Sequence, residues 1–171
     1  MQDCTNQEIA ANVDHSVPTG FDCLAAGTPV WTELGPVPVE QIQVGDRVLV
    51  QDVSTGELCY KPVLGTTIRP TGRLVKIEIS GDESFGASGG HRFWVSGQGW
   101  VKTRSMGADS LLHTVVGAAE VETVGLGQAE PTYNLIVADF HTFFVGRARV
   151  LSHDNTPVAP TDTVVPGLPG R

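Results

Sequence analysis

The 171-residue sequence has no long apolar run, no concentration of basic residues and few cysteines. No window reaches the 18 consecutive apolar residues of a membrane-spanning helix, so we expect no membrane partner. The first twenty residues are polar and acidic and lack the apolar centre of a secretory signal, and the compartment stays unassigned. Because Lys and Arg form no stripe along the chain, we expect no nucleic-acid partner either.

Charged residues make up only 18% of the chain, whereas Gly (20) and Pro (11) are frequent. A helical bundle or a coiled coil needs more Glu, Lys, Ala and Leu and fewer helix breakers. Short segments rich in β-branched residues alternate with turn residues, which predicts an all-β domain. The predicted strands are 28–32, 47–53, 58–63, 73–79, 93–95, 100–102, 111–116, 118–124, 132–137, 141–145 and 149–152, with helical turns at 39–43 and 102–106.

The strand signals divide the chain into three parts. Residues 1–22 carry four carboxylates and neither Lys nor Arg, and we interpret them as an N-terminal flank. Residues 23–155 form the predicted domain. Residues 156–171 are rich in Pro and Gly, which is typical of an extended tail.

One cysteine falls on a border of the predicted domain. Three cysteines are too few for a disulfide framework, and without a Cys-x-x-Cys pair we expect no structural zinc site. Cys23 opens the strand-rich part, where its thiol can attack the carbonyl of Asp22 and convert that amide into a thioester. His91 can protonate the departing nitrogen, and Ser88 can hydrogen-bond the same peptide group.

The other border has a second reactive group of residues, His153-Asp154-Asn155-Thr156. An Asn or Asp side chain can attack its own backbone carbonyl and cleave the peptide bond that follows. His153 can protonate the leaving nitrogen or polarise the carbonyl. The Thr156 hydroxyl can receive an acyl group by transesterification.

Several motifs follow one another in a characteristic order. They are Cys23-Leu-Ala-Ala-Gly-Thr-Pro-Val, Val44-Gly-Asp-Arg-Val, Ser88-Gly-Gly-His-Arg-Phe-Trp-Val, Thr132-Tyr-Asn-Leu-Ile-Val, Phe140-His-Thr-Phe-Phe-Val-Gly and Val150-Leu-Ser-His. This series resembles the Hint (hedgehog/intein) module, in particular its bacterial intein-like and polymorphic-toxin branch. The resemblance implies a horseshoe of short, mostly antiparallel strands whose termini converge on one site, and self-processing that starts with an N-to-S acyl shift.

The resemblance assigns roles by position. Cys23 matches the N-terminal nucleophile and His91 the central histidine that activates the scissile amide. Ser88 stands where the family usually has Thr and keeps its hydroxyl. His141 matches a histidine common in the last-but-one motif, and His153 matches the penultimate histidine.

Two departures from the family pattern leave the C-terminal step open. Asp154 stands where the family usually has Asn, and Asn155 follows one residue later. Either Asn155 cyclises, or Asp154 attacks, or C-terminal cleavage is weak. Asn134 replaces an Asp found in many inteins, which weakens the expected coupling of the two steps. The Asp22 carboxylate can attack the thioester and so favour N-terminal cleavage over ligation.

The expected activity is therefore single-turnover, autocatalytic cleavage or ligation rather than that of a turnover enzyme. We expect a monomer that acts on its own flanking segments and needs no cofactor and no metal. Two alternatives remain at this stage. One is a multiple-turnover cysteine hydrolase using Cys23, although no helix follows that would lower the pKa of its thiol. The other is a non-catalytic β scaffold.

Overall fold

The computed structural model describes residues 22–157, which form strands and two short 3₁₀ turns but no α-helix. The strands form one highly curved antiparallel sheet, and no helix of the described residues is long and apolar enough to cross a membrane. The elements are β1 (Leu24–Ala25), β2 (Pro29–Thr32), β3 (Gly35–Pro38), η1 (Val39–Gln41), β4 (Arg47–Gln51), β5 (Leu58–Ile79), β6 (Glu83–Ser88), β7 (Arg92–Val95), β8 (Gly99–Lys102), η2 (Thr103–Ser105), β9 (Leu111–Thr114), β10 (Gly117–Val137), β11 (Thr142–Val145) and β12 (Val150–His153).

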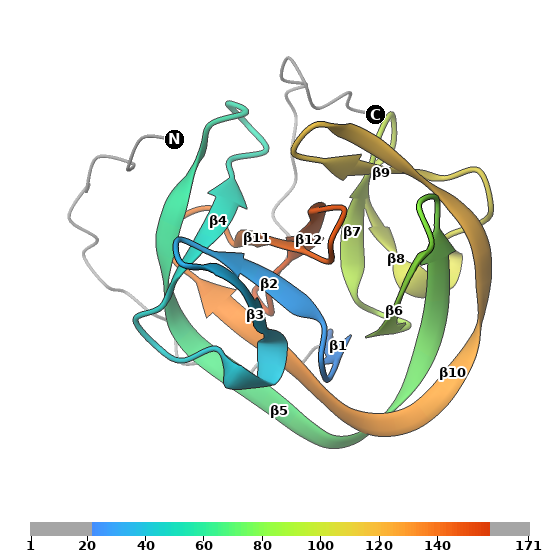
Figure 1. The fold of residues 1–171 in the computed structure, drawn as a ribbon, viewed down its shortest axis with the longest axis horizontal. Coiled ribbons are helices and arrows are strands. Elements are labelled where there is room, and N and C mark those ends of the chain that lie inside the picture. The colour runs from blue at the N-terminus through green and yellow to red at the C-terminus, as the bar shows by residue number, and fades with distance from the viewer. Residues whose placement is uncertain (1–21, 158–171) are drawn as a thin grey trace.

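Two long strands form the frame of the molecule. β5 and β10 pair antiparallel from Val121 opposite Ile79 to Val137 opposite Val63, and together they curve around the shorter strands (Figure 1). The register shifts at four places along this pair, including the stretch around Ala129 and Thr132. Such irregularities add twist and bend a ladder, which is how two extended strands can wrap around a core.

The shorter strands bring the candidate residues to the inside of this frame. β1 lies between β6 and β10, with Leu24 opposite Ala87 on one side and Tyr133 on the other. β12 pairs with β11 and, at Ser152, with Phe93 of β7. The residues directly before β1 and directly after β12 are therefore attached to strands that have a paired neighbour on each side.

The predicted all-β class and both helical turns are confirmed, but several boundaries were wrong. The segments 58–63 and 73–79 belong to one strand, and so do 118–124 and 132–137. Pro70 and Gly72 interrupt the sequence pattern of β5, but pairing with β10 keeps the backbone extended through them. The strands β1, β3 and β6 were not predicted from the sequence.

The hydrophobic core fills the space inside the curved sheet. One cluster of buried side chains extends from Leu24 and Val30 through Phe93 to Phe143. A second, smaller cluster of buried side chains consists of Leu49, Trp94, Phe144 and Leu151. Both clusters contain residues of β7, β11 or β12, so the strands that carry the candidate histidines are anchored in the core.

Candidate functional site

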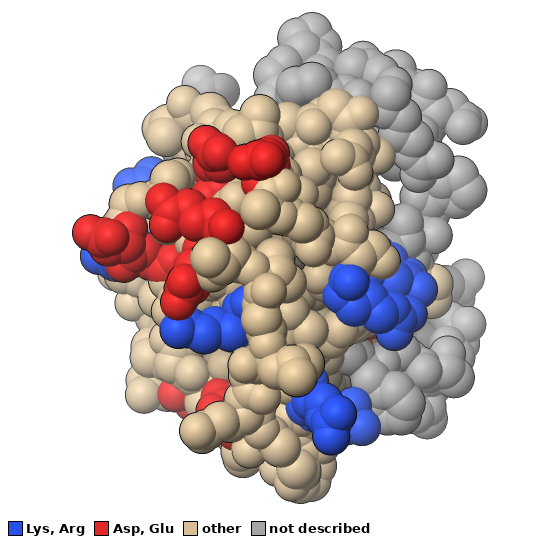
Figure 2. Space-filling view, turned by 90° about the vertical axis from the view of Figure 1, so that its right-hand side faces the viewer, with Lys and Arg blue, Asp and Glu red and all other residues tan. Residues whose placement is uncertain are grey.

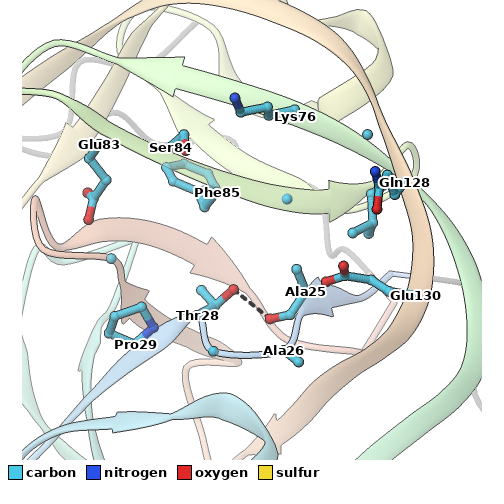
Figure 3. Close-up of a pocket in the computed structure, with 15 residues that line it drawn as sticks. Ala25, Ala26, Thr28, Pro29, Lys76, Glu83, Ser84, Phe85, Gln128 and Glu130 are labelled. Atoms are coloured by element: carbon cyan, nitrogen blue, oxygen red, sulfur yellow. Dashed lines mark hydrogen bonds between the residues drawn. The ribbon is translucent and has the colours of Figure 1, made fainter.

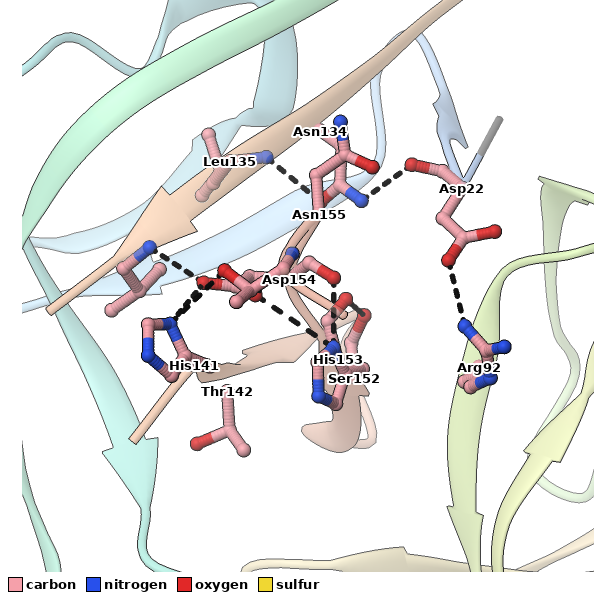
Figure 4. Close-up of polar contacts among 12 residues, drawn as sticks. Asp22, Arg92, Asn134, Leu135, His141, Thr142, Ser152, His153, Asp154 and Asn155 are labelled. Atoms are coloured by element: carbon pink, nitrogen blue, oxygen red, sulfur yellow. Dashed lines mark hydrogen bonds and ion pairs between the residues drawn. The ribbon is translucent and has the colours of Figure 1, made fainter. Parts of the chain in front are cut away.

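The two borders of the predicted domain meet at adjacent residues of β10. The Asn134 side-chain amide donates a short hydrogen bond to the carbonyl oxygen of Asp22, and the backbone N–H of Asn155 donates to the carbonyl of Leu135 at 2.9 Å. Figure 4 shows Asp22, Asn134, Asp154 and Asn155 in one close-up. The structure thus brings the N-terminal junction and the C-terminal junction into a single site.

Cys23 is a buried, free thiol at the N-terminal junction. Its backbone N–H donates to the Ser88 hydroxyl at 2.9 Å, and its carbonyl accepts from the Ser88 N–H at 2.8 Å. Ser88 therefore contacts the amide of the Asp22–Cys23 bond, as the sequence predicted. Burial raises the pKa of the Cys23 thiol; the Thr132 hydroxyl opposes this, and the Asp22 carboxylate adds to it.

His91 lies fully buried beside the same peptide bond. Its Nε2 shares a 2.6 Å hydrogen bond with the Ser152 hydroxyl, and its Nδ1 has no hydrogen-bond partner among the described residues. Burial lowers the pKa of His91 to about 3, and repulsion by the charge of His153 acts in the same direction, whereas the backbone of Asp22 opposes it. His91 is therefore neutral at physiological pH, with one ring nitrogen fixed by Ser152 and the other available to a reacting group.

Asn134, which the sequence marked only as a departure from the family pattern, lies in the site itself. Its Oδ1 accepts from the N–H of Leu135 at 2.7 Å, so the amide group can only present its NH₂ to Asp22. The side chain is fully buried. A buried donor aimed at a carbonyl oxygen is suited to stabilise the negative charge that forms there during attack.

Asp22 is held at its side chain as well as at its carbonyl. Arg92, the residue after His91, forms an ion pair with the Asp22 carboxylate at 2.9 Å, visible in Figure 4. Desolvation raises the pKa of Asp22, and Arg92 is the strongest of several cations that oppose this rise. Arg92 and Ser152 are further residues of the site that sequence reasoning missed; only their positions beside His91 and His153 could have pointed to them.

At the C-terminal junction, His153 is directed at the carbonyl of the next residue. Its Nδ1 donates to the Asp154 carbonyl oxygen at 2.8 Å. Its ring packs edge-on against Trp100, with centroids 4.8 Å apart. Burial lowers the pKa of His153, and the Asp154 backbone and carboxylate oppose this. The carbonyl that His153 polarises therefore belongs to the Asp154–Asn155 bond.

The Asp154 carboxylate is fully buried and accepts hydrogen bonds from three groups. Oδ2 accepts from the Val137 N–H at 2.8 Å and from His141 Nδ1 at 3.1 Å, and Oδ1 accepts from the Thr156 N–H at 2.8 Å. The hydrogen bond to Asp154 raises the pKa of His141. Since every donor here meets an oxygen, a carboxylate fits this place better than a carboxamide.

Asn155 and Thr156 occupy the outer part of this network. The Asn155 side-chain amide donates to the Thr67 hydroxyl at 3.4 Å, and the Thr156 hydroxyl lies 3.1 Å from His141 Nδ1. All eight predicted site residues thus lie at the two junctions. Contacts join His141, His153 and Thr156 to Asp154, whereas Asn155 contacts Thr67 and Leu135 instead. Ser152, which precedes His153, contacts His91.

A cavity lies beside β1, and none of the eight predicted site residues lines it. It measures about 400 Å³ and is lined by the loop Ala25–Pro29 and by side chains of β5, β6 and β10. Figure 3 shows Phe85 and Lys76 on one wall and Ala26 and Pro29 on the other. Within residues 22–157, no group of three or more His, Cys, Asp or Glu side chains is arranged to hold a metal ion.

A family model described as the pretoxin Hint domain matches residues 30–155. The chain belongs to this family. The bacterial intein-like domain of Clostridium thermocellum is 33% identical, with a TM-score of 0.72, and the match covers 77% of this chain and 97% of that one. A curated protein with significant similarity was not found.

Two inteins of lower identity share the fold of this Hint domain. A DnaB intein from Synechocystis sp. PCC 6803 is 12% identical, with a TM-score of 0.69, and the match covers 78% of this chain and 98% of that one. The gp41-1 intein is 21% identical, with a TM-score of 0.66 and coverage of 78% and 99%. The Hint fold and the polymorphic-toxin branch predicted from the sequence are confirmed, and the fold is that of self-processing domains.

Proposed function

We propose that this Hint domain releases its N-terminal flank by an N-to-S acyl shift at the Asp22–Cys23 bond. One observation carries the proposal: both polar atoms of this peptide bond are held by side chains. Ser88 accepts from the nitrogen and Asn134 donates to the oxygen, beside a buried free thiol. Held in this way, the bond is oriented for attack and the developing oxyanion has a donor in place.

The acyl shift balances with residues of this chain alone. The Cys23 sulfur attacks the Asp22 carbonyl carbon, and its proton passes to Nδ1 of neutral His91. Asn134 stabilises the oxyanion. The carbon–nitrogen bond breaks as His91 returns the proton to the Cys23 nitrogen, which leaves a thioester and a free amine. Water or an added thiol then takes the acyl group and releases residues 1–22.

At the C-terminal junction, the contacts favour the bond after Asp154. His153 donates to the Asp154 carbonyl, so attack by the Asp154 side chain would release the amine of Asn155. Both carboxylate oxygens already accept hydrogen bonds, which lowers their nucleophilicity and makes this step slow. Cyclisation of Asn155, with Thr156 as the leaving or acyl-accepting residue, stays the alternative prediction. We propose that N-terminal cleavage dominates over splicing, with the domain ending at 154 or 155.

The test follows the intact mass of the 171-residue chain with time, with and without dithiothreitol. The wild type is expected to lose residues 1–22 faster with thiol, leaving a product that begins at Cys23. Cys23→Ala is expected to stay whole at this junction, because no thioester can form. Near-ultraviolet circular dichroism of both proteins verifies that Cys23→Ala is folded. An intact wild type under all conditions, or equal cleavage of Cys23→Ala, would contradict the proposal.

A mixing experiment separates self-processing from the two alternatives. Isotope-labelled Cys23→Ala is incubated with unlabelled wild type. Self-processing predicts that only the unlabelled chain is cleaved, because the thiol reaches only its own preceding carbonyl. Cleavage of the labelled chain would indicate a turnover hydrolase, and no cleavage of either chain would indicate a scaffold. A joined product of 1–22 with the tail would show splicing instead of cleavage.

A further inference from the structure

A strongly basic pocket lies beside the N-terminal junction of this acidic chain. The cavity measures about 440 Å³ and is lined by the loop Ser88–Gly90, by Asp22 and by five of the eleven basic residues of the protein. On the face seen in Figure 2, acidic side chains gather on the left, where some basic ones touch them, and further basic side chains lie apart from them on the right. The basic residues of the pocket are Arg69, Arg73, Arg92, Lys102 and Arg104.

Three parts of the fold bring these charges together. Arg92 of β7 is paired with Lys102 at the end of β8, so the two side chains emerge from neighbouring strands. Arg104 in η2 is fixed by a backbone hydrogen bond to Gly89 at 3.0 Å, and its Cβ lies close enough that a side chain at position 89 would touch it. The remaining two arginines come from β5. A cleft lined by charges of one sign attracts the opposite sign, so this gathering of cations favours the binding of an anion among them.

Among the described residues that line this pocket, Asp22 supplies the one carboxylate. Its Oδ2 lies 2.9 Å from Arg92 Nη1, and the side chains of Asp22 and Arg92 are 14% and 25% exposed, so water screens the pair only partly. Arg92, Lys102 and Arg104 all act to lower the pKa of Asp22 against the effect of burial. The carboxylate is thus held in the pocket by charge, while the carbonyl of the same residue is held by Asn134.

We propose that this pocket binds the acidic side chain of the residue before Cys23, so that the domain selects a flank ending in Asp or Glu. The inference rests on the proposed acyl shift and names its substrate class. With the carboxylate fixed on Arg92 and the carbonyl on Asn134, Asp22 can adopt one orientation toward the thiol. Asp22 thereby acts as a recognition group, a different role from the attack on the thioester that its sequence position suggested.

The rate of flank release in excess dithiothreitol tests the selection, because the thiol takes up the acyl group and a carboxylate nucleophile is not needed. Asp22→Glu is expected to react within about threefold of the wild type. Asp22→Asn is expected to react about tenfold more slowly, because it loses an ion pair that water screens only partly. Asp22→Lys is expected to be slower than Asp22→Asn. Adding 1 M NaCl should slow the wild type and leave Asp22→Asn unchanged.

The matched control is Lys76→Met, which removes one positive charge from an exposed pair with Glu78 outside the pocket. It is expected to cleave at the wild-type rate. Equal rates for Glu, Asn and Lys at position 22, insensitive to salt, would overturn the selection while leaving the acyl shift intact. The failure of the wild type to cleave at all would count against the proposed function instead.

A stability measurement tests the pocket without cleavage. In the Cys23→Ala background, Asp22→Asn and Arg92→Gln are combined in a double-mutant cycle, with thermal unfolding as the readout. The proposal predicts that the two changes are non-additive at low salt and additive at 1 M NaCl. Additive effects under both conditions would show that the carboxylate and the guanidinium are not coupled, and would overturn the binding role of the pocket.

Discussion

The two junctions of this Hint domain lie side by side but are built on different groups. At the N-terminal junction, side chains contact the amide nitrogen and the carbonyl oxygen of the bond expected to react. At the C-terminal junction, three donors contact the side chain of Asp154, and His153 is the one side chain within residues 22–157 that contacts its carbonyl. One junction holds a peptide bond ready for attack, and the other holds the carboxylate that would have to attack.

This difference bears on which reaction the site favours. A side chain that accepts three hydrogen bonds is stabilised as an anion in its place, and this stabilisation is lost if it leaves to attack. The Cys23 thiol lies beside an oriented amide, burial raises its pKa against the effect of the Thr132 hydroxyl, and it carries no charge that three donors stabilise. The contrast predicts that substitutions at the N-terminal junction slow the acyl shift, which is the fast step. Substitutions of Asp154 are predicted to speed C-terminal cleavage, which is the slow step.

The largest expected effect comes from Asn134→Ala, which removes the donor to the Asp22 carbonyl. Release of residues 1–22 in dithiothreitol should slow by about 100- to 1,000-fold, as is typical when one oxyanion donor is removed. The measurement is the rate from intact-mass time courses. Thr66→Ala, at an exposed position on β5, serves as the control. An unchanged rate for Asn134→Ala would remove the distinction between the junctions.

Asp154→Asn tests the slow junction. It should speed cleavage of the 154–155 bond roughly tenfold, about 1.4 kcal/mol in barrier height, because an amide nitrogen replaces a hydrogen-bonded carboxylate. It should also lower the free energy of unfolding by about 1–3 kcal/mol, since one N–H donor then faces an NH₂ group. Mass spectrometry locates the cleaved bond. If Asn155→Ala abolishes C-terminal cleavage and Asp154→Asn leaves it unchanged, Asn155 is the attacking residue, and the proposed cleavage after residue 154 is wrong.

Ser152→Ala should have a smaller effect, because Ser152 acts through His91. Loss of the 2.6 Å contact frees the ring and should slow the acyl shift by about three- to tenfold, the value of one lost hydrogen bond. The pH profile separates positioning from folding: the rate should rise toward alkaline pH in the wild type, following the raised pKa of Cys23, and less steeply in the variant. Ser96→Ala is the control serine; an identical profile for both variants would contradict the role.

The smallest effect concerns stability. Asp154 raises the pKa of His141, so protonated His141 stabilises the fold below its unfolded pKa, and this contribution is lost as pH rises through the folded pKa. Because His141 is 40% exposed, the contribution should stay below about 1 kcal/mol. Urea unfolding between pH 6 and 9 should show a decline for the wild type that His141→Gln lacks. A parallel decline in both proteins would contradict the pairing.

Some elements followed directly from the sequence pattern and others could not. The hairpin between β4 and β5 begins with alternating residues and a Ser-Thr-Gly turn, which are local signals. β6 contains Gly86, whose missing side chain lets Leu74 and Ala25 approach: a Cβ there would meet them at 3.0 and 3.2 Å. That glycine weakens the strand signal of the sequence, and its reason appears only when β1, β5 and β6 are side by side.

The site shows the same division between residues. Cys23, His91 and His153 could be identified because thiols and imidazoles at motif positions have few structural roles. Ser152 and Arg92 carry common side chains within strands and gave no signal, and Asn134 was noted only as a departure from the family pattern, without its contact to Asp22. Each gains its role from a partner more than sixty residues away in the chain.

By itself, the sequence determined the all-β class and the family and named the residues proposed to attack or to transfer a proton, because these depend on side-chain chemistry and local pattern. The tertiary structure decided which groups face one another. It brought Asp22 and Asn155 into hydrogen bonds with two adjacent residues of β10. It also paired His91 with Ser152 and directed His153 at the carbonyl of Asp154. Hydrogen bonds act over about 3 Å, so which contacts form depends on how β5 and β10 bend around the core.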